Sequence, residues 1–362
     1  MKHNTTVSKI LQEIIREKEI EKLSEKHGYE DKGRKAKVTT MIRYHLSGAI
    51  EKSESYRAME IDGMKNGLVE TDYSTLSRKS KEIPYEISLE LLVKTMERAN
   101  RKQRRAITKE YNRFVRCFDT TVWVDTNKRW NWTPYQEGKN GIKAHISYQA
   151  SMGLPDRFSI GAIKVGDTAK LEEFCQKGEE TDCVLADRGY LNISKFCHLD
   201  DRGQDFVIRI SDRVNFVNPV PHDFVTDREK YTDIVCSLGK DRAIPVKYRA
   251  RQFRVVSFMG DNGKNVTLCT NIYSLTADEI AGLYRMRWQI EVFFKTLKQN
   301  FSLKKIFGST INAVFSQIII NFIAYIILFN SFSLSFSHIS FLAFLRKLRA
   351  NLISDTDFVY LL

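Results

Sequence analysis

The residues best suited to do chemistry lie between Tyr284 and Lys298, in the segment Tyr-Arg-Met-Arg-Trp-Gln-Ile-Glu-Val-Phe-Phe-Lys-Thr-Leu-Lys. An α-helix turns by about 100° per residue. If the segment is one helix, a phenol, two cations and a carboxylate fall on a strip about 60° wide. The strip is formed by Tyr284, Arg287, Glu291 and Lys298.

An apolar stripe lies beside this polar strip and suits a core-facing surface. It comprises Leu283, Ile290, Phe294, Leu297 and Phe301. A half-buried carboxylate between cations suits an acidic metal ligand next to a phosphate site. The alternative interpretation is a solvated helix face on which Arg287 and Glu291 make an ordinary ion pair.

Two further carboxylates stand at unusual positions. Asp119 interrupts an otherwise apolar strand pattern, where burial alone would penalise a charge. Asp187 ends the short apolar run Cys-Val-Leu-Ala and is followed by Arg188-Gly-Tyr. Together with Glu291 they predict a site for two divalent cations about 3.5–4 Å apart, as used in phosphodiester transfer.

Magnesium suits oxygen ligands of this kind, and manganese is the other candidate. Each carboxylate also has a structural alternative: Asp119 as a turn cap, Asp187 as a β-turn residue and Glu291 as a surface ion-pair partner. Asp125 shares strand parity with Asp119 and is the alternative ligand if the strand is placed differently.

The composition favours a polyanionic partner. The 362 residues include 57 Lys and Arg against 44 Asp and Glu, a formal charge of +13. Nucleic acid is the simplest partner, although ribosomal, membrane-surface and ordinary basic proteins share this balance. Aromatic residues at 11% and hydrophobic residues at 43% exclude a disordered chain.

Cysteine spacing and the N-terminus indicate a cytoplasmic protein. The six cysteines include no Cys-x-x-Cys pair, which predicts reduced thiols, and the charged residues 1–30 do not resemble a signal peptide. Residues 306–345 carry no Lys, Arg, Asp or Glu. Asn and Gln side chains interrupt this run, so we expect buried helices packed behind the catalytic sheet, with a membrane span as the alternative.

Residues 1–108 are predicted to be helical and to contact DNA. Within residues 72–81, hydroxyls and the cations Arg78 and Lys79 resemble groups that bind phosphates and base edges in helix-turn-helix proteins. A basic stripe follows, with Arg101, Arg104 and Arg105 among its members. The alternatives are a solvated basic turn for the first segment and an exposed linker helix for the second.

From residue 114 the pattern changes to strands. We expect strands at 114–124, 142–150, 157–165, 183–186, 206–210, 251–258 and 266–270, and a helix at 169–175. Thr276 and Glu279 form a capping-box pattern, which predicts that the helix with the polar strip begins there.

Three motifs together resemble a DDE transposase of the insertion-sequence-four family. They are Asp119-Thr-Thr, Asp187-Arg-Gly-Tyr and the series Tyr284-x2-Arg287-x3-Glu291-x6-Lys298. The last is similar to that family's Tyr-Arg-Glu-Lys signature at every position. Further similarity lies at 139–143, 206–209, 270–271, 307–309 and 312–317, so the resemblance covers nearly the whole chain.

The resemblance implies an α/β fold. Its parts would be an RNase H-like core of mixed sheet flanked by helices, an N-terminal all-helical domain, and a β-rich insertion before the last catalytic helix. It implies that Asp119, Asp187 and Glu291 are the catalytic metal ligands. It also implies DNA-phosphate contacts by Tyr284, Arg287 and Lys298, to which we add Arg188. Cleavage through a hairpin at the transposon end is a further implication.

The implied domains are 1–108 (DNA-binding), 109–203 and 273–345 (the two parts of the core), 204–272 (insertion) and 346–362 (tail). The implied protein is a magnesium-dependent bacterial enzyme, cytoplasmic and associated with the nucleoid. It would cut double-stranded DNA at terminal inverted repeats and join it to target DNA as a homodimer, without a membrane partner. The competing hypothesis is a catalytically decayed or repurposed DNA-binding protein.

Overall fold

The computed structural model describes residues 5–13, 16–33, 36–107, 114–127, 129–133, 140–163, 167–175, 183–211, 213–222, 229–239, 245–260, 263–336 and 338–350. The chain divides into two compact units. Unit 1 comprises residues 1–107, 123–141 and 292–362, and unit 2 comprises residues 108–122 and 142–291. The first residue of the predicted segment 139–143, and the tail beyond residue 350, lie outside the described part of the chain.

Unit 1 is built from helices, as expected for the N-terminal region. Its N-terminal helices are α1 (Thr5–Glu13), α2 (Glu17–Lys26), α3 (Val38–Glu51), α4 (Tyr56–Lys65), α5 (Tyr73–Glu82) and α6 (Tyr85–Ile107). Two later helices, α11 (Ile311–Ser335) and α12 (Phe341–Arg349), belong to the same unit.

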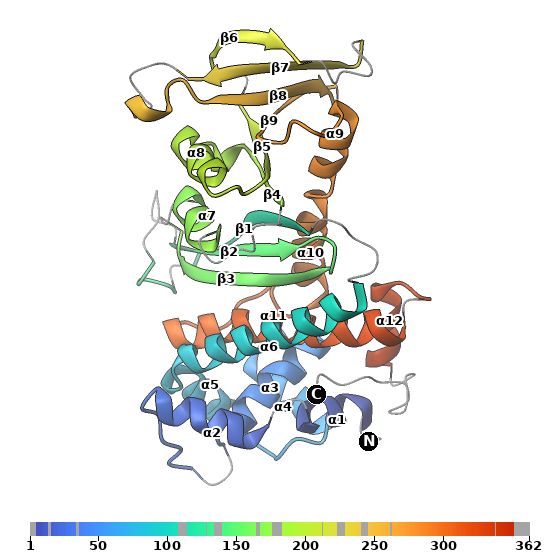
Figure 1. The fold of residues 1–362 in the computed structure, drawn as a ribbon. Coiled ribbons are helices and arrows are strands. Elements are labelled where there is room, and N and C mark those ends of the chain that lie inside the picture. Colours follow the sequence, from blue (N-terminus) through green and yellow to red (C-terminus); the bar gives the residue numbers. More distant parts are fainter. Residues whose placement is uncertain are drawn as a thin grey trace. The chain divides into compact units, whose positions relative to one another are not determined.

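Helix α11 forms the core of unit 1. It packs against α6, α3 and α5, and Figure 1 shows it running alongside α6. By length and composition α11 would pass as a membrane span, but 89% of its most apolar window is buried inside the protein. The burial predicted for this segment is therefore confirmed. Within unit 1 its apolar surface packs against the N-terminal helices, and packing behind the sheet stays a prediction.

The strands form one nine-stranded sheet in the order β3-β2-β1-β4-β5-β9-β8-β7-β6 (Figure 1). Its strands are β1 (Val115–Asp125), β2 (Asn140–Gln149), β3 (Leu154–Ala162), β4 (Cys183–Ala186), β5 (Phe206–Ile210), β6 (Phe216–Pro221), β7 (Tyr231–Leu238), β8 (Gln252–Met259) and β9 (Asn265–Thr270). Strand β4 is parallel to both β1 and β5, whereas β9 pairs antiparallel with β5 and the order β9-β8-β7-β6 is antiparallel throughout.

Helices cover both sides of the central strands in unit 2. Helices α7 (Asp167–Cys175) and α8 (Ile193–Asp201) bury Phe174 and Phe196 in a core with Phe206, Phe253 and Val255. Helix α9 (Ala277–Arg285) contacts β5 and β8 and lies on the other side of the sheet (Figure 1). The result is a mixed α/β fold with a large mixed sheet flanked by helices.

All the strands predicted from the sequence are present, but two strands and helix α8 were not predicted. Strand β6 is exposed along its whole length and contains two prolines. Such a strand carries no alternation of buried and exposed residues, and its prolines are tolerated only because it forms the sheet edge.

Candidate active site

Strands β1 and β4 place two of the predicted carboxylates side by side. The strands are parallel and Phe118 is paired with Ala186, so Asp119 on β1 lies beside Asp187, the residue that follows β4. Neighbouring strands in a sheet lie about 4.8 Å apart. Asp187 also accepts a hydrogen bond from the Gly189 amide at 2.9 Å, which fixes the turn after β4.

The third carboxylate is brought in by the helices that follow the sheet. The capping box at Thr276 and Glu279 is confirmed and starts α9. The prediction of one continuous helix is wrong, because α9 ends at Arg285 and α10 (Trp288–Asn300) begins after a two-residue turn. The backbone bond from the Arg287 amide to the Tyr284 carbonyl, at 3.0 Å, spans three residues in place of four and tightens the chain here.

Arg287, which lies in this turn, joins two of the three carboxylates. Its Nη1 lies 3.5 Å from Asp119 Oδ2, and its Nη2 donates a hydrogen bond to Glu291 Oε1. The guanidinium carbon also lies 5.7 Å from the ring centroid of Tyr284. The pKa of Arg287 is raised: burial opposes its charge, but Tyr284, Glu291 and Asp119 outweigh that effect.

Asp119 carries the clearest electrostatic signature of the cluster. Burial, together with the negative charges of Asp187 and Glu291, raises its pKa from 3.8 to about 6, against the opposing effects of the Thr120 amide and Arg287. The charges of Asp187 and Glu291 are therefore close enough to act on Asp119, and all three residues belong to unit 2. This excess of negative charge at a half-buried site favours a bound cation.

The raised pKa predicts how stability depends on pH in the absence of divalent cations. The folded chain binds the Asp119 proton more tightly than the unfolded chain does, so stability falls as pH rises from about 4 to about 6. We expect Asp119→Asn to remove this loss and to be more stable than the native chain above pH 6, by about 1–3 kcal/mol. Thermal unfolding across this pH range measures it, and an unchanged pH profile would contradict the assignment.

The oxygen atoms of the three carboxylates suit a hard divalent cation, but the side chains are not arranged to coordinate one ion together. Within the described residues, no three His, Cys, Asp or Glu side chains are close enough to hold a metal ion. The Arg287 guanidinium supplies the positive charge beside Asp119 and Glu291. Coordination by all three carboxylates therefore requires Arg287 to turn away from them.

A basic cavity adjoins the carboxylates. It has a volume of about 320 Å³ and is lined by Asp187, Arg188, Arg209, Lys264, Tyr284 and Arg287. Four cations around one carboxylate suit the phosphates of a nucleic acid backbone. The pKa of Tyr284 is raised, mainly by burial, while Arg287 and Arg209 oppose that shift, which places the phenol among these cations.

Arg209 and Lys264 are cavity residues that the sequence analysis did not identify. Arg209 is the only charged residue in the strand Phe-Val-Ile-Arg-Ile, a signal comparable to that of Asp119. Lys264 comes from the connection between β8 and β9, and no spacing in the sequence links it to the carboxylates.

The other predicted DNA contacts lie in unit 1, whereas the residues that line the cavity belong to unit 2. Lys298 is on α10, with its Nζ 5.5 Å from the ring centroid of Trp123. Arg78 is exposed and pairs with Glu82 at 3.0 Å, and Arg101 is exposed. Arg104 and Arg105 lie in α6, but their side chains are outside the described part of the structure.

Lys79 does not fit the phosphate contact predicted for it. Only 5% of the residue is exposed, and its Nζ donates a hydrogen bond to the Tyr29 hydroxyl at 3.0 Å. The ammonium also lies 3.9 Å from Asp31. The charge is therefore used inside unit 1, where it holds the segment between α2 and α3 against α5.

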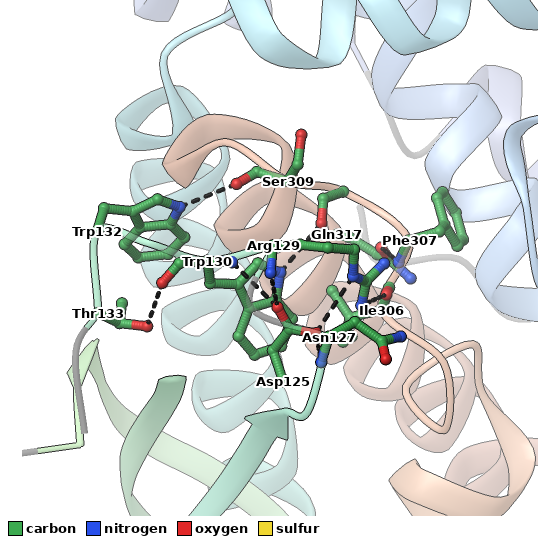
Figure 2. Close-up of polar contacts among 11 residues, drawn as sticks. Asp125, Asn127, Arg129, Trp130, Trp132, Thr133, Ile306, Phe307, Ser309 and Gln317 are labelled. Carbon is green, nitrogen blue, oxygen red and sulfur yellow. Dashed lines mark hydrogen bonds and ion pairs between the residues drawn. The ribbon is translucent and has the colours of Figure 1, made fainter. Parts of the chain in front are cut away.

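Asp125, the alternative metal ligand, has a structural role. Figure 2 shows it accepting hydrogen bonds from the residues that follow β1, among them the Trp130 amide at 3.0 Å and Arg129 Nε at 3.2 Å. Arg129 in turn donates to the Ile306 carbonyl at 3.0 Å, and Trp132 donates to the Ser309 carbonyl at 2.9 Å. Asp125 therefore ties the end of β1 to the chain after α10.

Comparisons with known proteins identify the family. A family model described as "Transposase DDE domain" matches residues 110–327. The chain is 30% identical over 334 residues to the "Probable transposase for insertion sequence element IS5377" of Geobacillus stearothermophilus, covering 91% of this chain and 85% of that protein. It is 24% identical over 266 residues, 71% of each chain, to a transposase assigned to insertion sequence element IS4SA of Synechocystis sp..

A solved structure was also matched, the synaptic complex of piggyBac transposase with hairpin DNA. The TM-score is 0.46 at 13% identity, with 96% of this chain and 80% of that chain covered. The family match over more than half of the chain and the extended identity to the Geobacillus protein are decisive. The chain belongs to the family of transposases that carry a DDE domain.

Proposed function

We propose that this chain is the transposase of a bacterial insertion sequence, which cleaves the ends of its element and joins them to target DNA. Asp119, Asp187 and Glu291 are its catalytic residues. The observation that carries the proposal is the pair of contacts from Arg287 to Asp119 and Glu291, since they gather the carboxylates beside a basic cavity. The family membership supports the same chemistry.

The basic cavity is the proposed phosphate site. Arg188, Arg209, Lys264 and Arg287 would neutralise the backbone next to the scissile bond, and the Tyr284 hydroxyl would donate a hydrogen bond to it. A phosphate oxygen competes directly with the carboxylates for the Arg287 guanidinium. DNA binding would therefore draw Arg287 away from Asp119 and Glu291 and free both for a cation.

The three carboxylates would hold Mg²⁺ or Mn²⁺, as two ions, supplied from solution. When bound, such ions activate a water or hydroxyl and stabilise the leaving oxygen of a phosphodiester. The chain's own contribution is to hold the oxygen ligands on rigid elements, two on adjacent strands and one on a helix. The raised pKa of Asp119 implies that, in the metal-free protein, this ligand is mostly ionised only above about pH 6.

The finer family assignment is the insertion-sequence-four group with its Tyr-Arg-Glu-Lys signature. The strand order β3-β2-β1-β4-β5, with β4 parallel to β1 and β5, supports an RNase H-like core. Strands β6 to β9 would be the β-rich insertion within 204–272. The remaining proposed boundaries are 1–108, 109–203, 273–345 and 346–362, and hairpin formation at the cut end belongs to the same assignment.

The proposed partners are the terminal inverted repeats and target DNA, bound by a homodimer in the bacterial cytoplasm and nucleoid. Lys298, Arg78, Arg101, Arg104 and Arg105 are the proposed contacts outside the cavity. The side chain of Lys79 is already engaged by Tyr29, so it is not among them.

Metal-dependent cleavage tests the proposal. Purified protein and a duplex carrying one end of the element should give a nick at that end with Mg²⁺ or Mn²⁺, because the carboxylates need a cation to act on a phosphate. Chelation with EDTA should abolish the nick and leave end binding in place. End binding without cleavage under either cation would favour the alternative of a decayed or repurposed DNA-binding protein.

A further inference from the structure

Trp123 and Lys298 form a contact that the proposed chemistry does not explain. Trp123 lies on β1, and Lys298 lies on α10, seven residues or about two turns after Glu291. The Lys298 ammonium is 5.5 Å from the centre of the Trp123 ring, and both residues belong to unit 1. This is within the range of a cation–π interaction, for which tryptophan is the best partner.

Both partners of this contact are shielded from water. Trp123 is only 7% exposed, and its Nε1 is buried without a hydrogen-bond partner among the described residues. No hydrogen bond from Nε1 to another described residue therefore orients the ring. Lys298 is half-buried, and burial lowers its pKa. A partly dehydrated ammonium gains more from an aromatic face than one in bulk water.

Both partners stand on rigid supports. The half of α10 that carries Lys298 is packed through Phe293, whose ring meets Tyr325 of α11 at 4.8 Å, and through the buried Leu297. The end of β1 is fixed two residues beyond Trp123 by Asp125 and its hydrogen bonds (Figure 2). What stays adjustable is the lysine stem, whose four-carbon chain has many rotamers.

We propose that Trp123 is a positioning residue that sets the Lys298 ammonium on the face of its ring so that it meets a DNA phosphate. The inference rests on the proposed phosphate contact of Lys298. The alternative is that Trp123 is only a core residue covered by the lysine stem, as long basic side chains often cover apolar surface. The two differ in whether changing the ring changes the electrostatics of DNA binding.

The salt dependence of binding to a labelled end duplex separates them. Loss of one phosphate contact lowers affinity and reduces the slope of log K against log salt by about one. Lys298→Ala should show this change. Trp123→Leu should reproduce most of it, with an affinity loss of about 3- to 10-fold. The double variant should be no worse than Lys298→Ala, because both changes remove the same contact.

Two further variants guard against a folding defect. Fluorinated tryptophan placed at position 123 keeps the shape of the ring while weakening its negative face, so affinity should fall as fluorines are added. Trp130→Leu removes a second buried tryptophan of unit 1, only 1% exposed. It should lower the thermal midpoint without changing the salt slope.

The possible outcomes distinguish failure of the role proposed for Trp123 from failure of the proposed transposase function. A normal salt slope in both Trp123→Leu and the fluorinated protein, with a reduced slope in Lys298→Ala, overturns the role of Trp123 alone. Additive losses in the double variant overturn it too. A normal slope in Lys298→Ala removes Lys298 from the phosphate contacts and overturns the inference with it, while cleavage at the carboxylates is tested separately.

Discussion

Replacing Asp187 with alanine is expected to reduce cleavage of the element's end by at least about 10³-fold, or roughly 4 kcal/mol in activation free energy. The reason is that Asp187, directly after β4, lies beside Asp119 of the parallel strand β1, so the site loses one of two neighbouring ligands. Binding of the uncut end should be retained, because the basic cavity keeps its cations. Single-turnover cleavage with saturating Mg²⁺ measures the loss.

Two controls separate chemistry from folding in this prediction. Asp187→Asn can still accept the hydrogen bond from the Gly189 amide, so it preserves the turn and removes only the charge. It should be as inactive as the alanine variant. Asp205→Ala removes an acidic residue that precedes the N-terminal end of β5, whereas Asp187 follows the C-terminal end of the neighbouring parallel strand β4, and this variant should cleave normally. Cleavage retained in Asp187→Asn would remove this residue from the metal ligands.

Replacing Arg287 with methionine is expected to impair both binding and cleavage. A charge-assisted hydrogen bond contributes about 1.5–3 kcal/mol, so loss of the phosphate contact should weaken end binding about 10- to 100-fold. Cleavage of the bound DNA should fall as well, because Arg287 would no longer hold the phosphate of the scissile bond beside the carboxylates. Equilibrium binding and single-turnover rates, measured on the same duplex, separate the two losses.

Arg285→Met is the matched control for Arg287, since Arg285 is exposed and lies two residues earlier. It should lower affinity slightly and leave the cleavage rate of bound DNA unchanged. Arg287→Lys should recover little, because an ammonium cannot reach two carboxylates or one phosphate with the same planar fork. Equal effects of the two methionine variants would mean that Arg287 contributes only general positive charge.

Much of the fold follows from local patterns in the sequence. The buried strands β4 and β5 are short apolar runs bounded by polar residues, and the start of α9 is marked by a capping box. Patterns of this kind depend on neighbouring residues alone, so they can be read without the tertiary structure. Strand β6 has no such pattern, because it pairs with β7 at the edge of the sheet and is exposed along its whole length.

The candidate site was predictable where the sequence itself carries the geometry. Asp119 stood out as a charge in an apolar strand, Asp187 by its place after a short apolar run, and Glu291 by its place between cations on a helical strip. In the structure the charges of Asp187 and Glu291 act on Asp119. Lys264 could not be found this way, because it reaches the cavity through the pairing of β8 and β9. The turn at Met286 and Arg287 was hidden for a related reason, since both residues are compatible with an α-helix.

Lys79 shows that a basic residue in a basic segment need not bind a phosphate. In the sequence it stands in a basic, hydroxyl-rich segment, which is typical of a surface that binds phosphate. In the structure it is buried, and its charge is met by Tyr29 and Asp31, which come from a distant part of the chain. Burial of a single lysine depends on such distant partners and leaves no local signal.

Locating bound manganese tests the central claim most directly. Crystals of the protein with its end duplex, grown with Mn²⁺, should show anomalous peaks about 3.5–4 Å apart. The peaks should be ligated by carboxylate oxygens of Asp119, Asp187 and Glu291, with Arg287 turned toward a DNA phosphate. Manganese bound elsewhere while Arg287 still joins Asp119 to Glu291 would contradict the account.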